Sequence, residues 1–426
     1  MAEGWKGERW RGIERPYSFE DVRLLRGSWP TECAIAKALS EKFWNLLKTR
    51  PYVFAAGALT GSQAVQMVDA GFEAIYVSGW QVAADANEAY SMYPDLGLYP
   101  SNSGPILVKR ILKALRRADQ IRALEGRSRP DYFVPLIADG EAGFGGPLHA
   151  FELVSAFLET GVASVHLEDQ HPTERRCGHL GGKVLAPLGN FKRTLIAARL
   201  AADVLDVPMV LIARTDAEGA SYITSDHDPV DSKYVYGEKT PEGYFRFRGG
   251  LDAAIDRALE VAPLAEMIWF ETKRLSLSDA KEFAKKVLSR YPDKMLAYNL
   301  SPSFNWRKSL TDEEIAAFQD ELGRMGYKFQ FITLAGFHAL NASMFELARG
   351  LRQRAMPAYV ELQEREFELE RFGYRAAKHQ TFVGTHYYDK LYDVITGGEA
   401  SARALEGSTE VEQFVRESKR SSGPVR

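Results

Sequence analysis

Residues 209–216 read MVLIARTD, an apolar run that passes directly into Arg214, Thr215 and Asp216. A run of this kind, without polar alternation, is typical of a strand that is buried on both faces of a parallel sheet. Seven further runs have the same form: VFAAGA (53–58), AIYVSG (74–79), FVPLIAD (133–139), SVHLED (164–169), MIWFET (267–272), MLAYNLS (295–301) and FQFITL (329–334). Together they indicate eight parallel strands.

Helical patterns fill the intervals between these runs. They span 105–125, 147–160, 190–205, 251–262, 276–290 and 311–326. Alternating strand and helix units predict an α/β fold, a (β/α)8 barrel, whose active site forms where the strands end. The polar residues that end the runs are Ser78, Asp139, Glu168, Arg214, Glu271, Asn299 and Thr333. Their shared position at one end of the barrel is what an active site requires.

Further segments extend the predicted barrel, which we place at residues 51–350. Residues 1–50 predict an N-terminal helical extension, and residues 217–250 have the Asp, Gly, Tyr and Phe content of a small inserted β element. Residues 351–426 predict a C-terminal helical region with a tail. The helical pattern begins at 336 and includes the charged stretch AYVELQEREFELERF. A long charged helix outside a barrel either faces solvent or packs on a neighbouring subunit.

The bulk composition is typical of a soluble globular enzyme. The chain has 426 residues and a formal net charge of −3, and its Lys and Arg residues form no basic stripe, so nucleic-acid binding is not expected. No apolar run approaches the ~20 residues that span a bilayer, so we expect no membrane association. Two cysteines, Cys33 and Cys177, give no disulfide framework, which favours a reducing cytoplasm.

The segment 174–183, ERRCGHLGGK, surrounds Cys177. Arg175 and Arg176, together with a protonated His179, are expected to lower the pKa of the thiol. The glycines of this segment give its backbone a freedom that a rigid element does not use. The pattern predicts a mobile, electropositive loop that carries a reactive thiol. The alternative is a solvent loop with an incidental cysteine.

Several carboxylates follow neighbouring predicted strands: Asp95, Asp139, Glu141 and Glu168. Gathered at one barrel mouth, they would repel one another unless they were protonated or neutralised by a cation. Oxygen ligands on loops suit Mg²⁺, with Mn²⁺ as the alternative. We expect Asp139 as the direct ligand and the other three to act largely through water. Taken singly, each carboxylate could instead cap a helix or pair with an arginine.

The same region also contains histidines and glycines that could indicate a zinc site or a nucleotide site. His166, His171, Cys177 and His179 cluster in sequence, but their spacing does not match that of zinc sites. The glycines of GFGG (143–146) resemble the start of a GxGxxG nucleotide fingerprint, but Leu148 stands where the third glycine belongs. We therefore expect neither zinc nor a dinucleotide.

Arg214 has the position of a guanidinium that binds a carboxylate group through two hydrogen bonds. Neutral donors for further carboxylate oxygens follow other strands, namely Asn299, Ser301, Ser303 and Thr333. Trp80 and Phe304 are aromatic residues that could shape the pocket. These parts predict a barrel enzyme that holds a small polyanionic acid through a divalent metal. The enzyme would make or break a bond beside a carboxylate, with the thiol exchanging a proton with a carbanion.

The ordered motifs of the chain resemble isocitrate lyase of the shorter bacterial type, in the isocitrate lyase/phosphoenolpyruvate mutase superfamily. The motifs are SGWQVAADAN (78–87), YPD (93–95), IADGEAGFGG (137–146), HLEDQ (166–170), RCGHLGGKV (176–184), IARTDAE (212–218), YNLSPSFNW (298–306) and KFQFITLAG (328–336). The likeness runs from about residue 17 to past 410. It implies Mg²⁺-dependent, retro-aldol cleavage of isocitrate to glyoxylate and succinate in the glyoxylate cycle.

The resemblance also implies roles for individual residues. Cys177 would donate a proton to the succinate carbanion from a loop that closes over the substrate, assisted by His179 and Glu271. The glyoxylate part would be held by Ser78, Gly79, Trp80 and Arg214. The succinate part would be held by Gly178, His179, Asn299, Ser301, Ser303 and Thr333. Tyr76 is one candidate for removing the hydroxyl proton, and a metal-bound water or a carboxylate is the other.

The same resemblance implies a homotetramer in which the C-terminal helices exchange between subunits and the tail helps to close the site. The sequence departs from the family at Arg175-Arg176, where lysines are usual, and at Leu300, where cysteine is frequent. Arginine keeps the positive charge but does not readily lose a proton. The alternatives are a 2-methylisocitrate lyase, which would release succinate and pyruvate, and a non-catalytic, redox-responsive homologue. The length and the LGGK sequence after Cys-Gly-His favour isocitrate.

Overall fold

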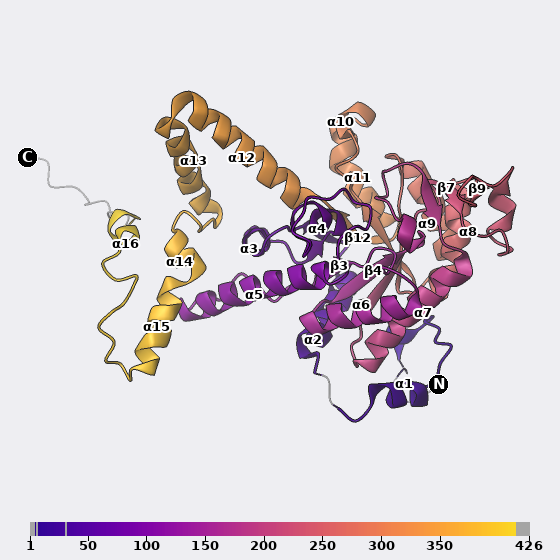
Figure 1. The fold of residues 1–426 in the computed structure, drawn as a ribbon. Helices are drawn as coiled ribbons and strands as arrows, with labels where there is room; N and C mark the ends of the chain where they lie inside the picture. The colour runs from indigo at the N-terminus through magenta and orange to yellow at the C-terminus, as the bar shows by residue number, and fades with distance from the viewer. Residues whose placement is uncertain (1–4, 6, 30–31, 415–426) are drawn as a thin grey trace, which may run out of the picture.

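A computed structural model describes residue 5 and residues 7–29 and 32–414 of the chain. Eight parallel strands close into a barrel, in which the spatial order of the strands is their order along the chain (Figure 1). The strands are β1 (Val53–Gly57), β2 (Ile75–Val77), β3 (Leu136–Asp139), β4 (Ser164–Glu168), β6 (Val210–Thr215), β10 (Met267–Phe270), β11 (Met295–Asn299) and β12 (Tyr327–Ile332). The predicted (β/α)8 barrel is confirmed, and each predicted apolar run overlaps one of its strands.

Large aromatic side chains fill the inside of the barrel. The ring of Phe331 lies 4.6 Å from that of Tyr76, 4.9 Å from that of Trp269 and 4.8 Å from that of Phe329, centroid to centroid. Phe43 of helix α2 (Ala34–Thr49) adds an edge contact to Phe329 at 5.5 Å. Helix α2 therefore closes one end of the barrel with apolar residues, which leaves the opposite mouth for polar chemistry.

Helices alternate with the strands as the apolar pattern predicts. Those that cover the barrel are α3 (Gly61–Asp69), α5 (Ser103–Leu124), α6 (Pro147–Thr160), α7 (Leu188–Val204), α8 (Leu251–Val261), α9 (Leu277–Arg290) and α11 (Asp312–Arg324). Short helical segments lie in the connections: α4 (Gly79–Asp85), α10 (Trp306–Ser309), η3 (Pro172–Glu174), η4 (Ser232–Tyr234) and η5 (Ala262–Leu264). Side-chain caps at Thr60, Ser276 and Thr311 accept backbone N–H bonds and set where α3, α9 and α11 begin.

The N-terminal extension is helical, as predicted. It contains η2 (Glu8–Trp10), α1 (Phe19–Arg26) and α2. Figure 1 places α1 and the N-terminus at the end of the barrel that α2 closes. The Arg9 side chain fixes this extension to the barrel, because it donates to Glu266 at 2.9 Å and to the Pro208 carbonyl at 2.9 Å.

The inserted β element is present, and it is larger than the sequence suggested. Strands β7 (Ala220–Ile223), β8 (Val235–Tyr236) and β9 (Phe245–Phe247) belong to a separate sheet of order β5-β7-β9-β8. Its edge strand β5 (Lys183–Leu185) comes from outside 217–250 and directly follows the Cys177 loop. The small sheet therefore anchors one end of that loop.

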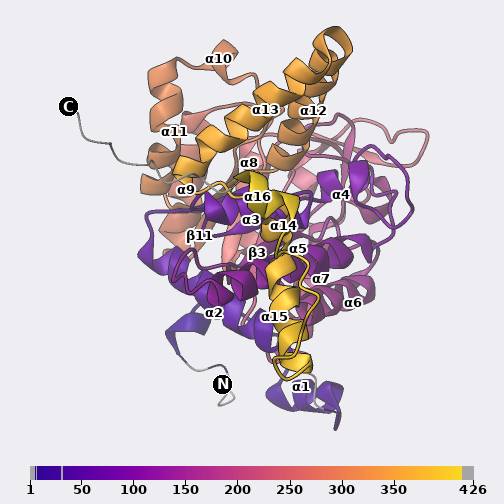
Figure 2. The ribbon, with the colours of Figure 1, turned by 90° about the vertical axis from the view of Figure 1, so that its left-hand side faces the viewer.

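The C-terminal region consists of helices that extend from the barrel (Figures 1 and 2). They are α12 (Ala335–Arg354), α13 (Met356–Leu369), η6 (Glu370–Phe372), α14 (His379–Val383), α15 (Thr385–Ile395) and α16 (Thr409–Phe414). Ala355, with φ of +53°, makes the turn between α12 and α13. Large apolar side chains on these helices are exposed in the single chain, including Phe345, Met356, Phe372 and Ile395.

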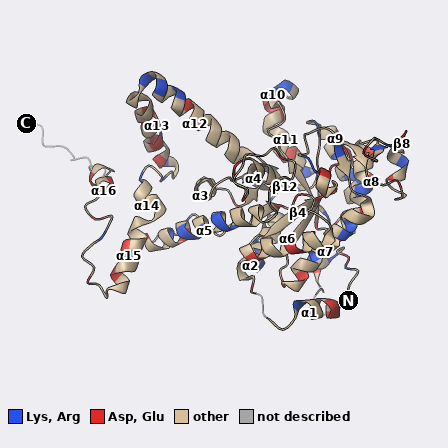
Figure 3. Cartoon of the chain, viewed as in Figure 1, with Lys and Arg blue, Asp and Glu red and all other residues tan. Residues whose placement is uncertain are grey.

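Charged residues of both signs are distributed over the surface (Figure 3). Figure 3 shows Lys and Arg along α5 and acidic residues on α13 and α15. Within the part of the chain that the structure describes, no helix combines the length and the apolar character that crossing a membrane requires.

Candidate active site

The predicted site residues come together at the barrel mouth opposite α2. One cavity is lined by Tyr76, Ser78, Trp80, Asp95, Asp139, Arg175, Cys177, Gly178, His179, Arg214, Trp269, Glu271, Asn299, Ser301, Ser303, Thr333 and Leu334. Gly79, Glu141 and Glu168 lie immediately around it through their contacts with Asp139 and Arg175. The cavity measures about 30 Å³. Pockets for small molecules begin at about 300 Å³, so the mouth is closed.

The turn after β2 supplies the first wall of the site. Ser78 caps α4 by accepting a bond from Gln81 N at 3.4 Å, which points the next backbone N–H groups toward the mouth. Gly79 N then donates to Asp139 Oδ2 at 3.0 Å. A Cβ at Gly79 would come within 2.2 Å of Glu141 Oε1. Glycine is therefore required where this backbone approaches the carboxylates.

Backbone amides hold Asp139 at the end of β3. Besides Gly79 N, Glu141 N donates to Asp139 Oδ1 at 2.9 Å. The backbone of Glu141 adopts a φ of +52°, which turns the chain back over the strand end. Tyr76 Oη lies 3.4 Å from Asp139 Oδ2 and 2.8 Å from His166 Nε2. Asp139 is thus fixed in place by uncharged donors.

Arg175 lies among the other three carboxylates, a placement that sequence reasoning missed. Its side chain is buried and forms ion pairs with Asp95, Glu141 and Glu168, the last at 2.9 Å. The sequence predicted that Arg175 makes the loop electropositive, and pairing with an arginine was only the alternative expected for each carboxylate taken singly. The arginine beside a cysteine was visible, but the carboxylate partners, including one at the end of another strand, were not.

The carboxylates at this mouth carry more negative charge than the arginines balance. Burial raises the pKa of Glu141 well above its usual value, and Asp139 and Glu168 raise it further. Burial also raises the pKa of Glu168, although Arg214 opposes the shift. An additional cation would relieve this excess, and buried carboxylate oxygens are the donors that Mg²⁺ or Mn²⁺ takes. The residues therefore fit a divalent metal. No group of three or more His, Cys, Asp or Glu side chains in the described ranges has ligating geometry by itself.

The Cys177 thiol differs from the sequence-based expectation. Burial raises its pKa, and this outweighs the lowering by the His179 N–H, Arg175 and Arg214. The expectation of a lowered thiol pKa is thus wrong for this conformation, because the loss of hydration around the sulfur outweighs the nearby positive charges. Cys177 N donates to the Asp95 carbonyl at 3.0 Å, which fixes the sulfur-bearing residue over the mouth. The thiol keeps its proton near neutral pH.

His179 of the loop lies beside Glu271, which follows β10. His179 Nε2 lies 3.1 Å from Glu271 Oε1, and the imidazole makes an edge contact with Phe304 at 5.0 Å. Burial opposes ionisation of Glu271, but Arg214 and His179 hold its pKa below the usual value. Glu271 therefore remains a carboxylate that orients the imidazole.

Arg214 ends β6 and is held in a fixed orientation. Its Nε and Nη2 donate to the two oxygens of Asp216 at 2.8 and 3.0 Å, and its Nη1 lies 3.1 Å from Glu168 Oε2. The guanidinium also stacks over Trp269, 4.4 Å from the ring centroid. Asp216 was not among the predicted site residues, although the sequence RTD at the end of this strand was a usable signal.

The neutral side chains predicted at two further strand ends also face the cavity. Asn299 Nδ2 lies 3.4 Å from Glu271 Oε1, and Ser303 N donates to Ser301 Oγ at 3.1 Å. Asn299 Oδ1 is buried without a hydrogen-bond partner. With Thr333, these groups offer uncharged hydrogen bonds to an oxygen-rich ligand.

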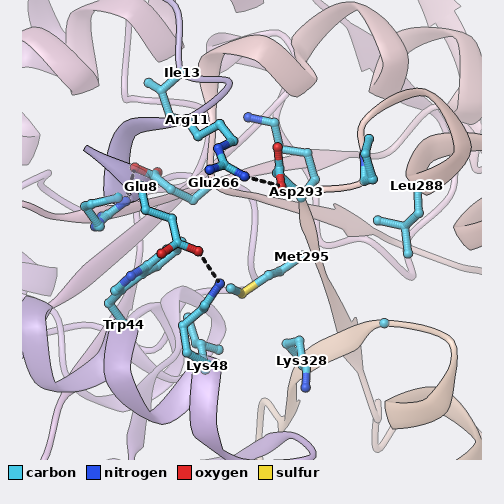
Figure 4. A pocket seen from close by; sticks show the side chains of 15 residues that line it. Glu8, Arg11, Ile13, Trp44, Lys48, Glu266, Leu288, Asp293, Met295 and Lys328 are labelled. Atoms are coloured by element: carbon cyan, nitrogen blue, oxygen red, sulfur yellow. Dashed lines mark hydrogen bonds and ion pairs between the residues drawn. The ribbon is translucent and has the colours of Figure 1, made fainter. Parts of the chain in front are cut away.

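A larger cavity of about 350 Å³ lies at the other end of the molecule, between the N-terminal extension and the barrel (Figure 4). Its charged residues are paired with each other, as in Lys48–Glu8 at 3.6 Å and Arg11–Asp293 at 3.8 Å. Lys328 donates to the Arg50 and Pro51 carbonyls. None of the predicted site residues lines this cavity, so its size does not make it the reaction site.

Comparison with known proteins identifies the family of the chain. The model of the "Isocitrate lyase family" matches residues 1–242 and 237–414. The chain is 57% identical to the isocitrate lyase of Halalkalibacterium halodurans, with 97% of each chain covered. It is 52% identical to the isocitrate lyase of Escherichia coli K12, with 97% of this chain and 98% of that one covered. A crystal structure of 2,3-dimethylmalate lyase, a member of the PEP mutase/isocitrate lyase superfamily, has the same fold, with a TM-score of 0.58 and 21% identity over 87% of this chain and 98% of that chain. The chain therefore belongs to the isocitrate lyase family of carbon–carbon lyases.

Proposed function

We propose that this chain cleaves isocitrate to glyoxylate and succinate, as an enzyme of the glyoxylate cycle. The observation that carries the proposal is the convergence of Cys177, Arg214, Glu271 and Asn299 on one cavity at the barrel mouth. Near-complete coverage by relatives that are named isocitrate lyase supports the choice of substrate.

The reaction begins with loss of the proton from the substrate hydroxyl group. The new alkoxide becomes the carbonyl of glyoxylate as the adjacent carbon–carbon bond breaks, and the electron pair stays on the succinate carbon. Burial and the nearby Asp139 raise the pKa of Tyr76 well above its usual value, so Tyr76 serves better as a hydrogen-bond donor than as the base. A carboxylate with a raised pKa, such as Glu141, is the better proton acceptor.

Cys177 then donates its proton to the succinate carbanion. A thiol whose pKa is raised by burial is protonated at neutral pH, which suits a general acid. His179, oriented by Glu271, lies on the same loop and stabilises the charge that develops around the sulfur.

The remaining side chains divide between the two halves of the substrate. Ser78, Gly79, Trp80 and Arg214 hold the glyoxylate half. The residues that hold the succinate half are Gly178, His179, Asn299, Ser301, Ser303 and Thr333. Backbone N–H groups, hydroxyls and one guanidinium suit carboxylate oxygens in both halves.

Asp139 would bind a divalent metal directly, and Asp95, Glu141 and Glu168 would act largely through water. We propose Mg²⁺, with Mn²⁺ as the alternative, because the donors are oxygen atoms. When bound, the metal would polarise the hydroxyl and carboxylate oxygens of the substrate and stabilise the alkoxide. Loading would require Arg175 to give up part of its contact with the carboxylates.

We further propose a homotetramer in which the C-terminal helices pack on neighbouring subunits. The exposed apolar residues of α12–α15 support this assembly, since single chains rarely leave so many large apolar side chains uncovered. A cytoplasmic location is supported by two cysteines that are both free thiols.

A glyoxylate assay on the purified chain tests the proposal. We expect glyoxylate to be released from isocitrate in the presence of Mg²⁺, with loss of activity in EDTA and recovery when excess Mg²⁺ is added. Absence of glyoxylate release under metal-replete conditions would contradict the activity. Activity that persists in EDTA would contradict the metal alone.

A further inference from the structure

The Cys177 loop lies in a closed position over the site. The cavity beneath it, at about 30 Å³, has no room for a tricarboxylic acid, so the loop must move for the substrate to enter. Gly178 shows how closely the loop backbone packs against the side chains below it. A Cβ on this residue would come within 2.5 Å of Glu271 Oε1 and 2.6 Å of Arg214 Nη2. Some contact must therefore hold Gly178 against these two side chains.

That contact comes from Lys183, the first residue of β5. Its side chain is 1% exposed, and its Nζ donates to the Gly178 carbonyl at 2.7 Å and to Asp216 Oδ1 at 2.9 Å. The backbone of Lys183 pairs with Ala220 of β7, so the small sheet fixes the position of the lysine backbone. The bond to Gly178, together with the bond from Cys177 N to the Asp95 carbonyl, holds the loop in the closed position.

The same lysine is connected to the substrate-binding arginine. Asp216 accepts two bonds from Arg214 and one from Lys183, so a single carboxylate orders both cations. Asp216 N in turn donates to Asp169 Oδ1 at 2.8 Å, which fixes the carboxylate to the end of β4. The position of the loop and the orientation of Arg214 therefore share one rigid support.

We propose that Lys183 is a positioning residue that latches the Cys177 loop shut through the Gly178 carbonyl and aligns it with Arg214 through Asp216. Lys183 is not among the residues that line the cavity. Lys183 sets the population of the closed conformation, in which the Cys177 thiol lies over the site. The expected effect of the latch on turnover rests on the proposed lyase activity. The expected effect on loop opening does not.

A purely structural role is the competing explanation, since a buried ammonium beside Asp216 also neutralises charge. Lys294 provides a matched control. It too is a buried lysine, 6% exposed, and donates to two backbone carbonyls, those of Gly12 at 2.8 Å and Ala265 at 2.9 Å. It lies at the opposite end of the barrel from the loop, so Lys294→Met reproduces the loss of a buried lysine without touching the latch.

The first experiment measures alkylation of Cys177 by iodoacetamide in a Cys33→Ser background, without substrate or metal. Cys177 is then the only thiol. It is half-buried in the closed loop, so we expect a slow alkylation rate in the parent that rises when the loop opens. We expect Lys183→Met to raise the alkylation rate by about tenfold to hundredfold, the range that one hydrogen bond to a charged group contributes. Lys183→Arg should fall between this variant and the parent. Lys294→Met should react like the parent. Equal rates in Lys183→Met and Lys294→Met would overturn the latch.

A second variant keeps the proposal testable if Lys183→Met does not fold. A Cβ at Gly219 would lie 2.5 Å from Lys183 Nζ, so Gly219→Ala should displace the ammonium without removing its charge. We expect faster alkylation than in the parent, by about threefold to tenfold. An unchanged alkylation rate in Gly219→Ala, with the melting temperature of the parent, would also overturn the proposal.

Steady-state kinetics in the Cys33→Ser background then connect the latch to turnover. Lys183→Met should lower kcat by about tenfold or more, with a smaller change in KM, because protonation requires the closed loop. Lys294→Met should leave both constants unchanged. If no protein in the series cleaves isocitrate but Lys183→Met is alkylated faster than both the parent and Lys294→Met, the proposed function fails and the latch stands. Faster alkylation without a change in kcat would overturn the link between the latch and catalysis.

Discussion

The two ends of the barrel each bury glutamates beside arginines, with opposite results. At the end that α2 closes, Glu266 accepts bonds from Arg199 at 2.5 Å, Arg9 at 2.9 Å and Leu211 N at 2.8 Å. Burial opposes its ionisation, but Arg199 and Arg9 lower its pKa to about 2. At the mouth that carries the candidate site, burial and neighbouring carboxylates raise the pKa of Glu141 and Glu168 well above their usual values.

The difference lies in charge balance rather than in burial. Two arginines surround the single carboxylate of Glu266, whereas Arg175 and Arg214 face a larger set of carboxylates at the mouth. A balanced end stabilises the fold. Excess negative charge at the other end lowers the stability of the free protein. The same charge is complementary to a cation that comes with the substrate. Functional sites are where such costs are expected. Four predictions test this comparison.

The largest effect is expected at the mouth. Cys177→Ser should lower kcat by about 10²–10⁴, the range for loss of general acid catalysis, while isocitrate binding stays within a few-fold of the wild type. Measurements are kcat from the glyoxylate assay and binding by calorimetry. Cys33→Ser is the control, because Cys33 lies at the start of α2, at the closed end. Near-normal kcat in Cys177→Ser would remove the thiol from the reaction.

The two glutamates should respond in opposite directions to the same substitution. Glu266→Gln removes a carboxylate whose pKa falls from 4.5 to about 2 on folding, so the free energy of unfolding at pH 7 should drop by about 3 kcal/mol. Glu141→Gln should leave the stability of the metal-free protein unchanged or raised, because it removes one of several repelling charges. Urea unfolding of both variants checks the signs. A loss of similar size in both would remove the distinction between the ends.

The contribution of Glu266 should depend on pH with a defined sign. Its folded pKa lies below its unfolded one, so the stabilisation is fully present above about pH 4.5 and is lost as the pH falls toward 2. The difference in unfolding free energy between the wild type and Glu266→Gln should therefore be constant from pH 7 to 5 and shrink below that. A difference that grows as the pH falls from 5 to 3 would contradict the assignment.

The smallest effect is expected in the larger cavity at the closed end (Figure 4). Glu8→Gln breaks the ion pair with Lys48 at 3.6 Å, whose partners are 73% and 48% exposed. Exposed pairs contribute about 0–1 kcal/mol, so unfolding free energy and kcat should both stay close to the wild type. A large change in kcat would mean that this cavity takes part in function after all.

The architecture was predictable because its signals are local. Continuous apolar runs such as MVLIARTD mark strands that are buried on both faces, and the helical patterns between them allow few other arrangements. The polar residues at the strand ends were predictable for the same reason, since parallel strands place all these ends at one mouth. The motifs around Cys177 and Arg214 then indicated the family, which the comparisons confirmed.

The state of each group was less predictable. The neighbours of Cys177 in sequence suggested a lowered pKa, but the loss of hydration around the thiol outweighs Arg175 and Arg214, so its pKa is raised. Strand β5 was not predicted, because its three residues pair with a segment much later in the chain. Lys183 in the sequence GGK gave no sign that it would reach Gly178 and Asp216.

The amino-acid sequence by itself determined the barrel, the end at which the polar residues gather and the identity of the proposed acid. It could do so because apolar periodicity and strand direction are properties of short segments. Only the tertiary structure decided which charges are balanced, that the Cys177 thiol keeps its proton and which lysine holds the loop. Those properties depend on burial and on distances between residues that are far apart in the chain, and both arise only when the whole fold is assembled.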